Sequence, residues 1–159
     1  MIIKFAKVRE SAVIPSKNDE DAGYDIYPCF EEDYVKIQPL ATVMIPSGIA
    51  SAVPDTHYFQ IQERGSTGTK GMKYGAGVID SGYRGEWFIP ITNCNDRNLV
   101  IAKDTEADFG DAIVYPYEKA IAQAILLEVP KAEVEEISYE ELQKIPSKRG
   151  SGRLGSSGK

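Results

Sequence analysis

The acid best placed to do chemistry is Asp80, in the stretch of residues 77–86. β-branched residues precede Asp80, and the strand-like run Trp87-Phe88-Ile89 follows it, so the sequence predicts a β-hairpin. The pair Ser81-Gly82 would form its turn, with the glycine at the positive φ that tight hairpin turns require. Tyr83 adds an aromatic ring three residues after the carboxylate. This pattern leaves two roles for Asp80, a turn former or a catalytic group.

A second segment, residues 63–71, has the composition of a phosphate-binding loop. Glycines and hydroxyl side chains lie there between Arg64 and Lys70. Exposed backbone N–H groups, hydroxyl donors and positive charge together suit a bound phosphate. An ordinary surface loop is the alternative, because the Walker pattern is absent.

Two polar side chains interrupt otherwise apolar strands. Asp25 lies in the expected strand 22–27, where its carboxylate either pins backbone N–H groups or holds water on a metal ion. Gln123 interrupts the expected strand 120–127, where its amide either makes a core hydrogen bond or faces a ligand phosphate.

The elements that must position these side chains are short strands. Pro and Gly residues divide the apolar runs every few residues, which is typical of a β-sandwich or jelly roll. We expect strands near residues 2–8, 22–27, 34–37, 41–45, 49–53, 58–62, 78–79, 87–93, 99–102, 112–115 and 120–127. The prediction is therefore an all-β fold.

One short helix is expected near the C-terminus. Ser138 and Glu141 have the spacing of a capping box, and Pro146 would end the helix. The following residues 147–159 contain four basic residues and no acid. Their glycines favour disorder in isolation, so this tail is either a simple flexible end or an arm that folds over polyphosphate. We divide the chain into a domain of residues 1–145 and an arm of residues 146–159.

Composition narrows the function classes. A chain of 159 residues is long enough for one domain with a sizeable core. The net charge of −6 argues against stable nucleic-acid binding. Cys29, Cys94 and His57 lack the spacing of a disulfide framework, a zinc site or a Ser-His-Asp triad. The sequence has neither a signal peptide nor a long apolar run, so we expect no membrane association and a cytoplasmic location.

Taken in order, these stretches resemble the five motifs of the trimeric deoxyuridine triphosphatases (dUTPases). The matching residues are 22–26, 64–66, 77–86, 120–123 and 149–158. The resemblance implies a distorted jelly-roll β-barrel and a homotrimer whose active sites lie between subunits and are closed by the C-terminal arm. It also implies hydrolysis of dUTP to dUMP and pyrophosphate, with Mg²⁺ on the triphosphate. That reaction keeps uracil out of DNA and supplies dUMP for dTMP synthesis.

The resemblance also implies roles for single residues. Asp80 would be the general base, and Tyr83 would stack beneath the deoxyribose. The metal contact would come from Asp25, through water. The uracil would be read by the backbone of Gly77, Val78 and Ile79. The phosphates would be contacted by Arg64, Gly65, Ser66 and Gln123. The arm would cover the nucleotide with Arg149, Leu154, Gly155, Ser156 and Ser157.

Some positions depart from the family pattern. Arg64-Gly65-Ser66 stands where the family usually has Arg-Ser-Gly, so the phosphate-touching hydroxyl is lost or moved by one residue. Leu154 replaces an aromatic residue that lies over the uracil, and Leu can cover a base but cannot stack on it. These departures concern single contacts and leave the expected reaction unchanged.

Two alternative functions differ in how well the sequence supports them, and the first, deamination, is disfavoured. The related dCTP deaminases carry a catalytic glutamate at the position of Pro90, which cannot transfer a proton. A dUTPase-like phage protein could instead act as a nucleotide-dependent regulator of a protein partner. A purely structural jelly roll would not explain the basic arm.

Overall fold

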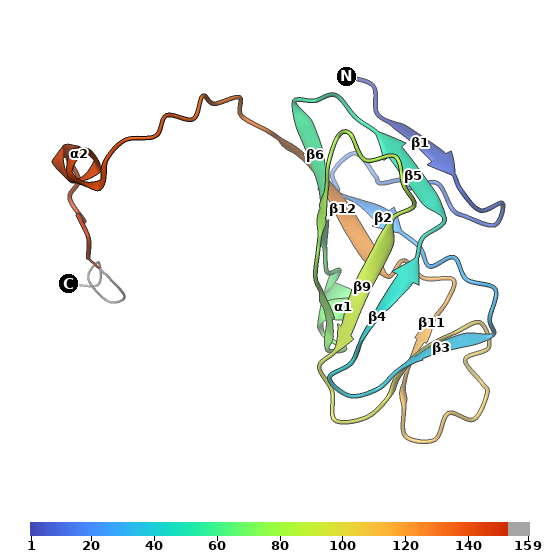
Figure 1. The fold of residues 1–159 in the computed structure, drawn as a ribbon. Coiled ribbons are helices and arrows are strands. Elements are labelled where there is room, and N and C mark those ends of the chain that lie inside the picture. Colours follow the sequence, from blue (N-terminus) through green and yellow to red (C-terminus); the bar gives the residue numbers. More distant parts are fainter. Residues whose placement is uncertain (153–159) are drawn as a thin grey trace.

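Strands dominate residues 1–152, the part of the chain that the computed structural model describes (Figure 1). The strands are β1 (Lys4–Lys7), β2 (Gly23–Ile26), β3 (Tyr34–Ile37), β4 (Thr42–Pro46), β5 (Ile49–Ala52), β6 (His57–Gln62), β7 (Met72–Tyr74), β8 (Val78–Ile79), β9 (Phe88–Asn93), β10 (Leu99–Ala102), β11 (Ile113–Pro116) and β12 (Ala122–Glu128). The helices are α1 (Gly65–Gly68) and α2 (Tyr139–Lys144). The predicted arm residues Leu154, Gly155, Ser156 and Ser157 lie outside the described part.

The strands form several small sheets. The largest has the order β2-β12-β6-β8, and a second has the order β4-β9-β7. Strands β11, β10 and β3 form a third, and β1 pairs with β5. All pairs are antiparallel except β10 with β11. This arrangement confirms the predicted all-β, jelly-roll class.

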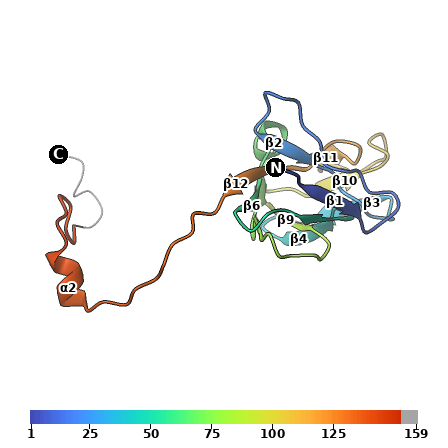
Figure 2. The same cartoon turned by 90° about the horizontal axis from the view of Figure 1, so that it is seen from above.

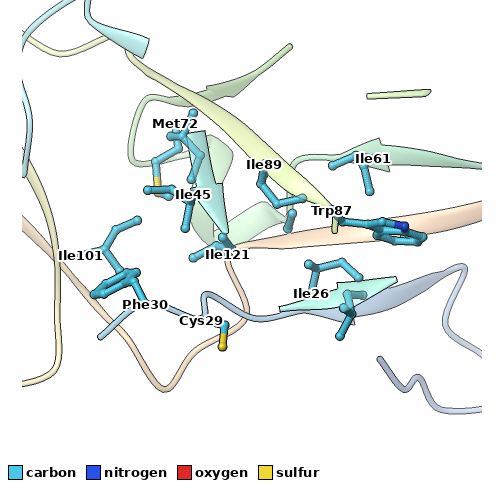
Figure 3. Close-up of a cluster of buried hydrophobic side chains, with 14 of the residues drawn as sticks. Ile26, Cys29, Phe30, Ile45, Ile61, Met72, Trp87, Ile89, Ile101 and Ile121 are labelled. Carbon is cyan, nitrogen blue, oxygen red and sulfur yellow. The ribbon is translucent and has the colours of Figure 1, made fainter. Parts of the chain in front are cut away.

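The sheets enclose one apolar core (Figure 3). Trp87 and Phe59 are fully buried at its centre, with ring centroids 5.1 Å apart and planes inclined by 63°. Such edge-on aromatic pairs add about 0.5–1.5 kcal/mol beyond the burial of their area. Ile26, Ile89 and Ile121 pack into the same core from three different segments. The core therefore fixes the strands that carry the candidate site residues.

The predicted hairpin around Asp80 is wrong in its pairing. Strand β8 pairs with β6, with Ile79 opposite Phe59, whereas β9 pairs with β4 and β7. The chain crosses between two sheets here because Trp87 enters the core, and its backbone N–H donates to Ile49 O at 2.9 Å. Positive φ falls on Ala76, at 45°, and Gly82 does not take it.

The two helices had different signals in the sequence. Helix α2 has the predicted capping box, since Glu141 N donates to Ser138 Oγ at 3.2 Å and Ser138 N donates to Glu141 Oε2 at 2.9 Å. Its C-cap is Ile145, immediately before Pro146. Helix α1 was not expected, because a single turn within residues 63–71 has no hydrophobic periodicity.

The segment after β12 leaves the barrel. Figures 1 and 2 both show α2 far from the sheets, joined to them by an extended connection. The side chains of α2 are all exposed. The predicted division of the chain at residue 145 stays a prediction. No helix in residues 1–152 is long and apolar enough to cross a membrane, and the expected cytoplasmic location also stays a prediction.

Candidate functional site

Asp80 lies exposed at the end of β8, beside a hollow of about 240 Å³. Buried Ile79 anchors β8 against Phe59 of β6, so the carboxylate follows directly from a fixed strand. The hollow is lined by Met44, Ala76, Val78, Ile79, Asp80, Tyr83, Glu86, Trp87, Phe88 and Pro90. The structure thus gathers an acid, an aromatic ring and an apolar wall around one small space.

Hydrogen bonds fix the turn that follows Asp80. Tyr83 N donates to Asp80 O at 3.1 Å. The Arg84 guanidinium donates to Ser81 O at 2.6 Å, to Tyr83 O at 3.0 Å and to Ser51 O on β5 at 3.3 Å. The turn is therefore tied both to itself and to a neighbouring strand, which preorganises the carboxylate.

Gly77 is required where it stands. A Cβ there would lie 2.7 Å from Gln60 Nε2 and 2.8 Å from Ile61 O, while Ile61 N donates to Gly77 O at 2.7 Å. Strand β8 is the last strand of the described four-stranded sheet. Its outer edge can therefore offer main-chain donors and acceptors to a flat ligand.

A second polar cluster centres on Asp25 and Arg64. Arg64 Nε lies 3.0 Å from Asp25 Oδ1, and a terminal nitrogen of the guanidinium donates to Oδ2 at 3.3 Å. The other terminal nitrogen donates to Ala120 O at 3.2 Å. About one third of each charged side chain is exposed, 31% for Arg64 and 33% for Asp25. Arg64 thus holds a carboxylate in place while part of its charge faces solvent. Within residues 1–152, the Asp25 carboxylate accepts from the Arg64 guanidinium and not from backbone N–H groups.

Gln123 completes this cluster. It is paired with Asp25 across β12 and β2, and its Nε2 donates to Glu63 O at 2.7 Å. A Cβ on Gly23 would lie 2.5 Å from Gln123 Oε1, so only glycine leaves room for the amide. The half-buried amide therefore has a backbone partner and also borders the cavity described next.

These groups line a polar cavity of about 450 Å³. Its lining residues are Asn18, Asp21, Ala22, Gly23, Asp25, Arg64, Gly65, Ser66 and Gln123. Ser66 Oγ lies 3.5 Å from the Tyr115 hydroxyl, at the limit of a hydrogen bond. A Cβ on Gly65 would have no neighbour within 4 Å. The family's serine position is therefore open space in this chain.

Two tyrosines, the buried Tyr115 and the partly buried Tyr74, support the backbone of this cluster. The Tyr115 hydroxyl donates to Ala120 O at 2.7 Å, the same oxygen that accepts from Arg64. The Tyr74 hydroxyl donates to Ile121 O, and burial raises the pKa of Tyr74. Both tyrosine hydroxyls therefore donate hydrogen bonds that fix the backbone before β12. Sequence reasoning did not identify either tyrosine. Tyr74 lies 47 residues from its partner Ile121, and Tyr115, only five residues before Ala120, belongs to no motif that marks it as a donor.

The residues around Asp25 fit Mg²⁺ through water. Within residues 1–152, no three His, Cys, Asp or Glu side chains gather closely enough to bind a metal ion directly. Mg²⁺ keeps several waters and is usually held by one or two carboxylates plus substrate phosphates. One fixed carboxylate in a polar cavity meets that requirement.

The predicted site residues form two separate groups within one chain. Ile79 lies opposite Phe59 near the start of β6, whereas Arg64 follows the end of β6. The five steps along the chain from Phe59 to Arg64 span about 16 Å when extended. Arg149 lies in the exposed segment after α2 and belongs to neither group. Within one chain, Asp80 and Arg64 are therefore too far apart to contact the same few atoms of a ligand.

Pro90 takes no part in proton transfer. It is buried in β9 opposite Met44 and lines the hollow beside Asp80 without an ionisable group. Pro90 therefore contributes only an apolar surface, at the position where the related deaminases would carry their glutamate.

Known proteins resemble this chain in sequence and in fold. A model of the family described as dUTPase matches residues 9–106. The deoxyuridine 5'-triphosphate nucleotidohydrolase of Candida glabrata is 34% identical over 160 residues, covering 99% of this chain and 97% of that protein. The dUTPase of Staphylococcus bacteriophage 80alpha with dUPNHPP matches with a TM-score of 0.78 at 21% identity, covering 99% of each chain. A mutant dUTPase from phage phi11 of S. aureus, in a structure that reveals the coordination of a structural Mg(II) ion, matches with a TM-score of 0.68 at 24% identity, covering 86% of this chain and 97% of that chain. Both solved structures share the fold of this chain.

Proposed function

Because this chain belongs to the dUTPase family, we propose that it hydrolyses dUTP to dUMP and pyrophosphate. The family predicted from the sequence is thereby confirmed. The observation that carries the proposal is the fixed turn at Asp80, where an exposed carboxylate, an unpaired edge of the described sheet and the Tyr83 ring border one hollow. This arrangement supports an enzyme that selects a nucleoside and activates water at the same place.

The nucleoside would lie against β8. The outer edge of Gly77, Val78 and Ile79 offers main-chain hydrogen bonds to uracil, whose own edge alternates acceptors and a donor. The Tyr83 ring, 45% exposed, would pack beneath the sugar and leave no room for a 2′-hydroxyl. Selection of uracil and of deoxyribose would thus depend on one short stretch of chain.

The triphosphate would lie in the polar cavity. Arg64 and the amide of Gln123 would donate to phosphate oxygens, with Gly65 and Ser66 at the rim. Asp25 would hold a water of the Mg²⁺ shell, and the bound ion would neutralise charge on the triphosphate. Phosphoryl transfer depends mainly on positioning and charge neutralisation, so this set needs no histidine.

Asp80 would act as the general base. A water molecule held by its carboxylate attacks the α-phosphorus while a proton passes to Asp80. The bond from the α-phosphorus to the bridging oxygen breaks, and pyrophosphate leaves with that oxygen. Asp80 then returns the proton to solvent. A positioned general base contributes about 10²–10⁴-fold to rate.

We further propose a homotrimer with each site shared between subunits. The support is the separation of the two groups along β6, since Asp80 and Arg64 must both act on one triphosphate. A second copy would bring its Arg64 group to the Asp80 of the first. The exposed segment after β12 suits an arm that reaches another subunit (Figure 2). Arg149, Leu154, Gly155, Ser156 and Ser157 would then cover the nucleotide.

A panel of nucleotides tests the activity. With Mg²⁺, the purified protein should release pyrophosphate from dUTP and hardly from dTTP, dCTP or UTP. Ammonia released from dCTP would overturn the proposal in favour of a deaminase. Binding of dUTP with no release of pyrophosphate would instead favour the nucleotide-dependent regulator.

A further inference from the structure

The carboxylate of Glu86, at the end of residues 77–86, is nearly buried and fully engaged. Its side chain is 12% exposed. Oε1 accepts from Arg9 Nε at 2.8 Å and from Gly48 N at 2.9 Å, and Oε2 accepts from the Arg9 terminal nitrogen at 3.3 Å. A carboxylate withdrawn from water is costly unless it is paired and hydrogen-bonded. Glu86 therefore depends on Arg9, although no step of the proposed reaction uses either residue.

The partners of Glu86 are themselves rigid. Val8 N and Arg9 N both donate to Gly48 O, at 2.7 Å and 3.2 Å. Gly48 has a φ of +68°, and a Cβ there would lie 2.7 Å from the sulfur of Cys29. No other residue fits that position without displacing its neighbours. The segment after β1 and the β4–β5 turn thus meet at one fixed point, to which Glu86 is tied.

Glu86 is also the residue that holds Tyr83. The Tyr83 hydroxyl donates to Glu86 O at 3.0 Å. The ring lies across Gly85, where a Cβ would collide with the Tyr83 hydroxyl. The ring is 45% exposed, so packing alone does not fix its orientation. The hydrogen bond from the Tyr83 hydroxyl to the anchored backbone carbonyl of Glu86 fixes the orientation of the ring.

We propose that the Arg9–Glu86 ion pair is a positioning device that sets the Tyr83 ring against the sugar and so determines the preference for deoxyribose over ribose. This inference rests on the proposed function, in which Tyr83 excludes the 2′-hydroxyl. The ion pair fixes the backbone of Glu86, the backbone carbonyl fixes the Tyr83 hydroxyl, and the hydroxyl fixes the ring. Arg9 and Glu86 act through Tyr83 and touch no reacting atom.

The first test measures selectivity as the ratio of kcat/KM for dUTP to kcat/KM for UTP. Arg9→Met should lower this ratio by about tenfold, because a mobile ring excludes the 2′-hydroxyl less well. Tyr83→Phe, which removes only the hydroxyl, should lower it similarly. Combining the two should lower it no further than Tyr83→Phe alone, since both changes break one chain of contacts. Independent, additive losses would overturn the proposal, as would an unchanged ratio in Arg9→Met.

Two further variants separate positioning from general destabilisation. Arg9→Lys keeps the positive charge but cannot make the bidentate contact with Glu86, so it should retain more of the selectivity than Arg9→Met does. Lys131→Met breaks an exposed ion pair with Asp55, at 3.4 Å, and should leave the ratio unchanged. A loss of selectivity in Lys131→Met equal to that in Arg9→Met would attribute the effect to lost charge and overturn the proposal.

The second test needs no substrate. Amide hydrogen exchange of residues 83–87 and of Gly48 should be faster in Arg9→Met than in the wild type, and unchanged in Lys131→Met. Unchanged exchange in Arg9→Met would overturn the positioning role. A wild-type protein that released no pyrophosphate from dUTP would refute the proposed function, whereas the exchange measurement would still decide whether Arg9 and Glu86 hold the turn.

Discussion

Mixing two inactive variants tests whether the candidate site is shared between subunits. Asp80→Asn removes the general base from one group, and Asp25→Asn removes the carboxylate that Arg64 holds in the other. Asp80→Asn alone should lose at least about a hundredfold in turnover of dUTP, and Asp25→Asn alone up to about a hundredfold. In a trimer that contains both variants, a site can pair the intact Asp80 of one subunit with the intact Asp25 of its neighbour. Activity should therefore return on mixing.

The structure sets the size of this recovery. Because the two groups lie about 16 Å apart along one chain, each site should take Asp80 and Asp25 from different subunits. If subunits mix randomly in equal amounts, about one quarter of the sites in a cyclic trimer combine two intact groups. The mixture should thus reach about a quarter of the wild-type activity.

The assay is pyrophosphate release from dUTP by the two variants co-expressed with different tags. The matched control co-expresses the wild type with the doubly substituted chain, Asp25→Asn with Asp80→Asn. Shared sites predict about a quarter of the wild-type activity for this control, whereas sites within single chains predict about half. No recovery in the first mixture together with half activity in the control would refute the shared site.

Three further predictions concern the phosphate cavity and the tyrosine that supports it. Gly65→Ser places a hydroxyl in open space at the rim of the phosphate cavity, where one added hydrogen bond to a charged phosphate should raise kcat/KM for dUTP by about tenfold. The control variant Gly68→Ser, on the same helix, should leave kcat/KM unchanged. Equal gains in both variants would contradict the assignment of position 65 to phosphate binding. Tyr74→Phe should lower the free energy of unfolding by about 1–3 kcal/mol in denaturant titrations, because Ile121 O loses its donor. Since burial raises the pKa of Tyr74, the unfolded chain ionises first, and the wild type should lose stability above about pH 10. The free energy of unfolding of Tyr74→Phe should fall less than that of the wild type over this pH range. An equal fall in both proteins would mean that other groups cause the pH dependence.

Local signals in the sequence predicted much of the fold. Alternating and β-branched runs predicted most strands, because side-chain burial on one face imposes that pattern. The capping box of Ser138 and Glu141 predicted the start of α2, since both partners lie within one turn. The order of the motifs predicted the family.

Local sequence patterns could not predict the contacts that build the site. Asp25 and Arg64 lie 39 residues apart, and Arg9 and Glu86 lie 77 apart, so no spacing rule joins them. The hairpin prediction was wrong because a turn-forming pair says nothing about which strand each side will join. Burial of Trp87 decided that question through the tertiary core.

The most direct test of the central claim is the effect of Asp80→Asn on turnover and on binding, measured together. The substitution keeps the size of the exposed side chain and removes its ability to take a proton. We predict that pyrophosphate release from dUTP falls by about 10²–10⁴-fold, while the affinity for a non-hydrolysable dUTP analogue changes little. Turnover within a factor of about two of the wild type would contradict the assignment of Asp80 as the general base.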